Sequence, residues 1–211
     1  MKFVEKRGGK YWPSKEMRRI AVVKSEVYER AAKNPIKFWE GLAENVHLFE
    51  PWKKAYEEKL PFFKWFVDGK LNLSYNCLDI HLENKANKTA VIFVPEDPLK
   101  SEIKLTYYDL FVKVNKFANL LKRQGVKKGD VVAIYLPLIP EALISMLACS
   151  RIGAIHSVVF SAFSAEALKS RIEEGGAKLL ITADGYFRRG KISNLRDKAD
   201  LAVKGTKVKK I

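Results

Sequence analysis

The sequence predicts an α/β fold, a doubly wound and mainly parallel sheet that follows a helical, aromatic-rich extension. From about residue 72, short apolar runs alternate with helical patterns of ten or more residues, which is typical of parallel strands covered on both faces. Helix-start signals stand before several of these patterns. All four tryptophans lie before residue 72. We therefore expect a helical extension over residues 1–71 and a partial α/β domain over residues 72–211.

The extension is expected to hold two main helices. Pro13-Ser14 opens one that reaches about Ala32, and Pro35 opens a second through residues 35–49, because proline suits the first turn of a helix. A short helical pair cannot bury its own apolar face. We therefore expect the aromatic rings of this region to anchor it on a domain surface, in preference to a sugar-stacking or membrane role.

The α/β region begins with a predicted helix over 74–86, capped by Ser74, and with strands over 89–94 and 103–107. Thr106 and Asp109 form a capping box for the next helix, which Gly125 ends. The later elements are a strand over 130–136, a helix from Pro140, a strand over 154–160, a helix capped by Ser164, a strand over 177–183 and a helix within 194–203.

The last residues, 208–211, resemble the start of another strand. Because a strand–helix unit needs a further parallel strand to complete it, we expect the chain to be truncated at its carboxyl end. An engineered piece, a gene remnant and one half of a split enzyme are all compatible with this expectation.

Composition excludes several classes of protein. The amino terminus has no apolar segment typical of a secretory signal, and prolines and charges interrupt the apolar stretch from residue 131 to 163. Cys77 and Cys149 are far apart and have no metal-binding neighbours, so we expect neither a disulfide framework nor a metal site. These features favour a cytoplasmic protein without a membrane partner.

The formal net charge of +15 is concentrated at the two ends. Residues 1–37 hold 11 Lys/Arg and 4 Asp/Glu, and residues 186–211 hold 9 and 2, whereas the segment between them holds 19 and 18. A nucleic-acid-binding face more often spreads basic residues over the helices of a folded core. We therefore expect no nucleic-acid partner, although a non-enzymatic basic binding module stays the alternative from another functional class.

A candidate ligand site follows the strand predicted over 177–183, in the stretch ADGYFRRGKIS. Gly185, Gly190 and Lys191 have the spacing of a phosphate-binding P-loop, but Ile192 stands where a Ser or Thr should hold magnesium. What remains is a cluster of Arg188, Arg189 and Lys191, with Gly190 permitting close approach. Such cations bind phosphate oxygens, so a phosphorylated ligand is one interpretation and a solvated basic loop is the other.

We predict no catalytic residue among the histidines or in a hydrolase motif. His47, His81 and His156 are widely separated, and His156 lies within an apolar strand, where a core imidazole is the simpler interpretation. The sequence also has no Gly-x-Ser-x-Gly elbow of the hydrolase type.

Three long segments carry a resemblance to a known family. They are KFWEGLAENVHLFEPWKKAYEE, KWFVDGKLNLSYNCLDIHLE, and the run from GVKKGDVVAIYLPLIPEAL through SRIGAIHSVVFSAFSAEAL to LLITADGYFRRGK. From about residue 36 to its end, the chain resembles the amino-terminal portion of AMP-forming acetyl-CoA synthetases. The resemblance implies that residues 72–211 are part of an AMP-binding, adenylate-forming domain.

The resemblance also implies a reaction and a site. Such enzymes convert acetate, ATP and coenzyme A to acetyl-CoA, AMP and pyrophosphate through acetyl-adenylate. It implies that Arg188, Arg189, Gly190 and Lys191 hold the nucleotide part of coenzyme A, and that Phe160, Ser161 and Ala162 line its route. The family's turn reads F-G-G-F, so Ser161 and Ala162 add bulk where the backbone comes close to the cofactor.

The family's ATP loop and adenylation lysine have no counterpart in this sequence, since none of the 12 glycines forms a Thr-Ser-Gly-Thr-Thr-Gly type of loop. We therefore expect that ATP and Mg²⁺ serve only the complete enzyme and that this chain alone forms no adenylate. Coenzyme A is the expected ligand, and the rest of the synthetase, as a separate chain, is a conceivable partner. Ligases for propionate or acetoacetate share this region and stay alternatives.

Overall fold

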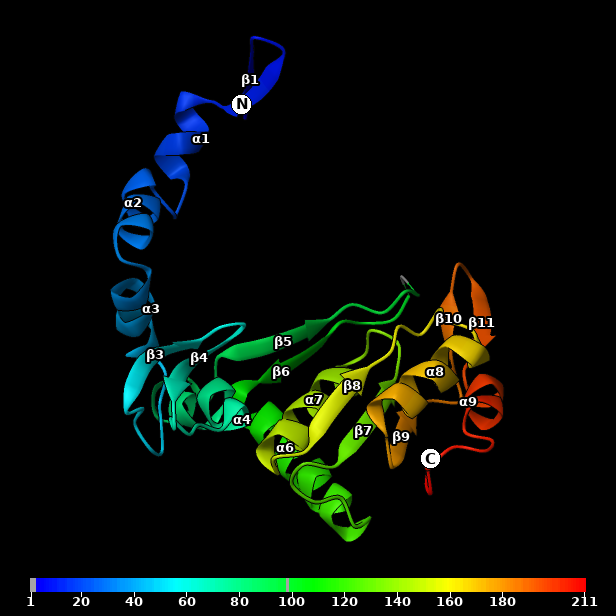
Figure 1. Ribbon diagram of the computed structural model, residues 1–211. Helices are drawn as coiled ribbons and strands as arrows, with labels where there is room; N and C mark the ends of the chain where they lie inside the picture. The colour runs from blue at the N-terminus through cyan, green and yellow to red at the C-terminus, as the bar shows by residue number, and fades with distance from the viewer. Residues whose placement is uncertain (1–2, 98) are drawn as a thin grey trace. The chain divides into compact units, whose positions relative to one another are not determined.

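The computed structural model describes residues 3–97 and 99–211 (Figure 1). Contacts between residues divide the chain into two compact units, which meet at Lys70 and Leu71. Within the described residues, no helix is long and apolar enough to span a membrane.

The first unit mixes helices with two antiparallel hairpins. Its elements are β1 (Val4–Arg7), β2 (Lys10–Pro13), α1 (Lys15–Ile20), α2 (Ser25–Lys33), α3 (Pro35–Ala43), β3 (Lys54–Lys59) and β4 (Phe62–Val67). Ser14 caps α1 by accepting a hydrogen bond from the Met17 amide, and Pro35 begins α3 as predicted.

The helix predicted to reach Ala32 is divided in two. The Lys24 ammonium lies 3.0 Å and 2.7 Å from the carbonyl oxygens of Arg18 and Arg19, which are among the last carbonyls of α1. These contacts satisfy acceptors that a continuing helix would have bonded internally. The prediction of one helix was therefore wrong at this point.

The two hairpins were not predicted. Gly8 and Gly9 have φ of 55° and 77°, the left-handed conformation that a two-residue turn between antiparallel strands requires, and they join β1 to β2. Across β3 and β4, the rings of Tyr56 and Trp65 face each other with centroids 4.8 Å apart. Aromatic pairs of this kind stabilise neighbouring strands.

The second unit is a doubly wound α/β domain, as predicted. Its elements are α4 (Leu73–Cys77), η1 (Asp79–His81), α5 (Leu82–Lys85), β5 (Thr89–Phe93), β6 (Ile103–Thr106), α6 (Tyr107–Arg123), β7 (Val131–Tyr135), α7 (Pro140–Arg151), β8 (Ile155–Val158), α8 (Ala165–Gly175), β9 (Leu179–Thr182), β10 (Gly185–Arg188), β11 (Lys191–Asn194) and α9 (Arg196–Ala202).

Strand β7 lies at the centre of a parallel sheet with the order β8-β7-β9. Its side chains alternate between two cores. Val132 and Ile134 pack with residues of α6 and α7, whereas Ala133 and Tyr135 pack with residues of α8 and α9. The connections after β7 and β8 therefore leave toward opposite faces of the sheet, and this makes the carboxyl edge beside β7 a topological switch point, where ligands of such folds bind.

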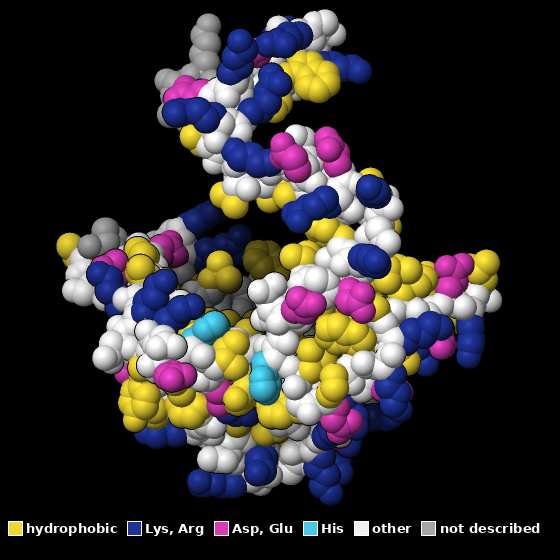
Figure 2. Space-filling view, turned by 90° about the vertical axis from the view of Figure 1, so that its left-hand side faces the viewer, with side chains coloured by type: hydrophobic (Ala, Val, Ile, Leu, Met, Phe, Trp, Pro, Cys, Tyr) yellow, Lys and Arg dark blue, Asp and Glu magenta, His cyan; other side chains and the backbone are white. Residues whose placement is uncertain are grey.

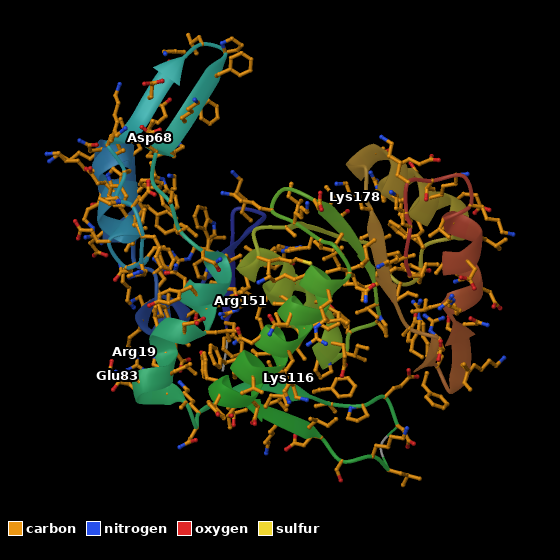
Figure 3. All side chains as sticks on the ribbon, turned by 90° about the horizontal axis from the view of Figure 1, so that it is seen from below. Arg19, Asp68, Glu83, Lys116, Arg151 and Lys178 are labelled. Carbon is orange, nitrogen blue, oxygen red and sulfur yellow. The ribbon has the colours of Figure 1, made fainter. Side chains whose placement is uncertain are left out.

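The start of this unit differs from the predicted single helix over 74–86. Asn72, not Ser74, caps α4, and the chain then breaks into η1 and α5. Ser74 is fully buried, and its hydroxyl oxygen accepts a hydrogen bond from Arg151 Nε at 3.2 Å. Figure 3 shows Arg151 beside α4. Ser74 thus fastens α4 to the end of α7, which explains why it is not available as a cap.

Two further pairings complete the unit. β5 and β6 form an antiparallel hairpin outside the parallel sheet. At the other end of the chain, Lys210 pairs in parallel with Leu179, and the Leu180 amide donates to the Lys210 carbonyl at 3.1 Å. The residues predicted to start another strand therefore do lie beside β9.

Candidate functional site

The basic cluster lies on a β-hairpin rather than on the irregular loop that the sequence led us to expect. β10 and β11 pair with Phe187 opposite Ile192 and Arg188 opposite Lys191. Arg189 and Gly190 form the two-residue turn, with φ of 53° and 72°. Because both positions of such a turn need positive φ, Gly190 serves the turn itself, and Arg189 adopts a conformation unusual for a side chain with a Cβ atom.

Three cations are therefore displayed at the tip of this hairpin. Arg188, Arg189 and Lys191 are all exposed. None of them enters an ion pair with another residue of 3–97 or 99–211. Since like charges directly opposite on paired strands repel, the Arg188–Lys191 pair does not stabilise the hairpin. The tip can instead bind an anion.

The second predicted segment is the turn after β8, and the side chain of Tyr135 hydrogen-bonds to its backbone. The hydroxyl of Tyr135 lies 3.0 Å from the Ser161 carbonyl oxygen and 2.8 Å from that of Phe163, so its single proton is shared between the two. Burial raises the pKa of the Tyr135 phenol, which keeps it a donor. Phe160 is 58% exposed, and its ring meets that of Phe163 edge to face, with centroids 5.9 Å apart.

The structure brings these two segments together. Ser161 is buried, and its hydroxyl donates to the Tyr186 hydroxyl across 3.4 Å, which links the turn to β10. This hydrogen bond and the nearby Arg188 lower the pKa of the Tyr186 phenol, because both favour the phenolate. Ala162 is the neighbour of Ser161 and is half-buried. All seven predicted site residues therefore lie near the carboxyl edge of β8 and β9.

A third segment, which sequence reasoning missed, also reaches the hairpin. It is the connection between β5 and β6. The Gly190 amide donates to Glu96 Oε1 at 3.2 Å, and the Lys100 ammonium lies 5.3 Å from the centroid of the Phe187 ring. Nothing local in the sequence indicates these contacts, because the partners are nearly a hundred residues apart.

The described residues also form a groove away from the basic hairpin. This groove of about 530 Å³ is lined by Asn119, Lys122, Lys127 and Lys128, among others, and it lies at the amino ends of the strands.

No cluster of metal-binding side chains occurs among the described residues. On the face shown in Figure 2, Lys and Arg side chains are dispersed among hydrophobic and acidic ones. The histidines form no group, and His156 is half-buried in β8.

A doubly wound α/β domain with cations at its carboxyl edge belongs to a broad class of nucleotide and cofactor binders. Comparison with family models narrows this class. The model described as AMP-binding enzyme matches residues 78–210, and that of the acetyl-coenzyme A synthetase N-terminus matches residues 25–77. The chain belongs to the AMP-binding enzyme family. The match begins at residue 25, earlier than the resemblance noted from about residue 36.

Curated relatives agree with this assignment. The chain is 48% identical over 204 residues to the acetyl-coenzyme A synthetase of Leptospira biflexa, and this match covers 93% of the chain and 31% of the relative. It is 48% identical over 194 residues to that of Gemmatimonas aurantiaca, covering 91% and 29%. It is 49% identical over 179 residues to the 3-hydroxypropionyl-coenzyme A synthetase of Sulfurisphaera tokodaii, covering 84% and 27%. The chain thus spans less than a third of the length of these relatives.

Proposed function

We propose that this chain supplies part of the coenzyme A-binding surface of an AMP-forming acetate–CoA ligase. The observation that carries the proposal is the display of Arg188, Arg189 and Lys191 on one hairpin tip at the carboxyl edge of the sheet. The family and the names of the relatives support the ligase class.

The chemistry of the site suits the nucleotide part of coenzyme A. Arginine forks bind phosphate oxygens in bidentate geometry, and a lysine adds a mobile point charge, so the tip can hold the 3′-phosphate and the pyrophosphate. The exposed ring of Phe160 offers a flat apolar surface to the adenine. Ser161 and Ala162 follow this ring in the chain, and the Ser161 hydroxyl links the turn to Tyr186 of β10.

The proposed reaction of the complete enzyme is the conversion of acetate, ATP and coenzyme A to acetyl-CoA, AMP and pyrophosphate through acetyl-adenylate. We propose that ATP and Mg²⁺ bind to parts of the complete enzyme outside this chain, which covers 31% of the Leptospira biflexa relative. We further propose that the chain alone releases no pyrophosphate from ATP and acetate. The test is a pyrophosphate-release assay with the chain alone and with a polypeptide that corresponds to the rest of a related synthetase. Turnover by the chain alone would contradict the proposal.

The acid substrate has a second candidate. A relative as similar as the acetyl-coenzyme A synthetases carries the name 3-hydroxypropionyl-coenzyme A synthetase. Because the proposed site holds only coenzyme A, it cannot favour one short acid over another. Comparing acetate, propionate, acetoacetate and 3-hydroxypropionate in the reconstituted assay would identify the acid by its kcat/KM.

Calorimetric titration of coenzyme A into the chain tests the proposed site. We expect saturable binding that Arg188→Ala weakens by about tenfold or more, because a charge-assisted hydrogen bond contributes about 1.5–3 kcal/mol. Lys127→Ala is the matched control, since it removes one exposed positive charge at the opposite end of the sheet. Equal weakening by both variants would indicate a general effect of charge and would contradict the site. Dephospho-coenzyme A should bind more weakly than coenzyme A, because it lacks the 3′-phosphate.

A further inference from the structure

The connection between β5 and β6 places one carboxylate at the tip of the basic hairpin. Glu96 Oε1 accepts the hydrogen bond of the Gly190 amide at 3.2 Å. Glu96 and Gly190 are both exposed, and a Cβ atom at Gly190 would meet nothing within 4 Å. The space beside Gly190 is therefore open, and the contact places an anionic oxygen at a cationic tip.

The geometry of the turn suits an anionic oxygen. Arg189 and Gly190 both have positive φ, and the Gly190 amide donates outward beside the cationic side chains of Arg188, Arg189 and Lys191. An amide next to several cations is a strong donor to a negatively charged oxygen. Glu96 thus shows, within the chain itself, which kind of atom this turn binds.

Resting on the coenzyme A site proposed above, we propose that Glu96 occupies the position of a ligand phosphate oxygen. Glu96 is then an internal competitor that sets the affinity of the hairpin for its ligand. A phosphate monoester carries a charge of about −1.5 to −2 and three acceptor oxygens, so it displaces a carboxylate that makes one exposed contact. A ligand with a single carboxylate has no such advantage over Glu96. The residue therefore also determines specificity for phosphorylated ligands.

A second contact keeps the displaced segment nearby. Lys100 lies in the same connection, and its ammonium stays 5.3 Å from the centroid of the Phe187 ring. This cation–π contact does not involve the Gly190 amide. When phosphate replaces Glu96, Lys100 remains beside the hairpin as a further cation for the ligand.

Three variants of the full chain test the proposal. Glu96→Ala removes the competitor, Glu96→Gln keeps the shape of the side chain but removes its charge, and Glu102→Ala removes an exposed carboxylate from the same connection. Glu102 pairs with Lys104 at 2.6 Å. Both alanine variants change the net charge equally, so general electrostatic attraction of the ligand affects them equally.

Coenzyme A and dephospho-coenzyme A are titrated into each variant at two salt concentrations. We expect Glu96→Ala to bind coenzyme A about fivefold more tightly than the unaltered chain, the effect of losing one exposed charged hydrogen bond. Glu96→Gln should show most of this gain, and Glu102→Ala should change the Kd less than about twofold. Added acetate should compete with coenzyme A more effectively in Glu96→Ala than in the unaltered chain.

The outcomes separate this inference from the proposed function. If the unaltered chain binds coenzyme A but Glu96→Ala binds it no more tightly than Glu102→Ala does, the competitor role is wrong and the site stands. If neither the unaltered chain nor Glu96→Ala binds coenzyme A, both proposals are wrong. Tighter binding that appears only in Glu96→Ala and Glu96→Gln supports both.

Discussion

Ser161 and Tyr186 are joined by a hydrogen bond between their hydroxyl groups, 3.4 Å apart, although 25 positions separate them in the chain. Ser161 follows β8 and Tyr186 lies in β10, so this contact connects the two segments of the candidate site. Ser161 is the donor, and donation to the phenol oxygen stabilises the phenolate form. The contact therefore has a consequence that can be measured in solution.

We predict that Ser161→Ala raises the pKa of Tyr186 back toward its ordinary value of 10, because the Ser161 hydrogen bond is the largest cause of the lowered pKa. The measurement is a spectrophotometric titration of phenolate absorbance. Tyr186→Phe identifies which transition belongs to this residue among the 8 tyrosines. If the curves of Ser161→Ala and the unaltered chain coincide, the hydrogen bond is absent in solution.

Arg151 is predicted to be a main stabilising contact of the second unit. It pairs with Asp79 through Nη1 and Nη2 of its guanidinium group, donates to Ser74 through Nε, and lies 5.3 Å from the centroid of the Phe111 ring. Its side chain and that of Asp79 are each less than one-fifth exposed. Arg151→Ala would leave Asp79 without its partner, and we expect the free energy of unfolding to fall by about 2 kcal/mol, less than for a fully buried pair.

Urea denaturation measures this effect, and two variants serve as controls. Arg171→Ala removes an arginine whose ion pair with Glu174 is exposed, and it should change the free energy of unfolding by less than about 0.5 kcal/mol. Arg151→Lys keeps the charge but not the two-pronged geometry, so it should be intermediate. Equal midpoints for Arg151→Ala and Arg171→Ala would contradict the role given to Arg151.

The parallel sheet and its helices could be predicted because their signals are local. β7 is a continuous apolar run whose last four residues, Val132–Tyr135, are all buried, as a central strand covered on both faces requires. The capping box of Thr106 and Asp109 and the Ser164 cap both occur where they were expected. A cap needs only a side chain and an amide two or three residues away.

The features that escaped prediction depend on distant partners or on strands without a clear apolar pattern. Asn72 replaces Ser74 as a cap because its side-chain amide also donates to the carbonyls of Ser150 and Arg151, 78 and 79 positions away. β10 and β11, with the sequences GYFR and KISN, show neither a continuous apolar run nor an apolar/polar alternation. The site residues of the hairpin could be chosen by their charge, whereas Glu96 could not be found without the structure.

The capping box of α6 should make stability depend on pH. Asp109 Oδ2 accepts hydrogen bonds from the Thr106 hydroxyl at 2.7 Å and the Thr106 amide at 2.9 Å, and the hydroxyl contact is the main reason that the pKa of Asp109 is lowered from 3.8. Because this pKa is lower in the folded state, the contribution is complete above the unfolded value and disappears as the pH falls through the folded value.

We therefore expect Asp109→Asn to be less stable than the unaltered chain near neutral pH and to approach it in acid, as measured by urea denaturation over a series of pH values. Thr106→Ala should cost about 1 kcal/mol near neutral pH, the usual effect of losing a helix cap. A difference between the unaltered chain and Asp109→Asn that stays constant down to the most acidic pH would exclude the ionised Asp109 as its source.

The two cysteines are predicted to differ sharply in reactivity. Cys77 is exposed at the end of α4, whereas Cys149 is fully buried in α7, and burial raises the pKa of its thiol to about 11. Only the thiolate reacts, and a reagent must also reach it. Partial burial also raises the pKa of the Cys77 thiol, but a reagent can reach it. With a thiol reagent at about pH 8, Cys77 should therefore react first and Cys149 only when the protein opens. Cys77→Ser should abolish the fast phase, and urea should restore one reactive thiol in that variant. Fast labelling of Cys77→Ser without urea would show that the core around α7 is not closed as described.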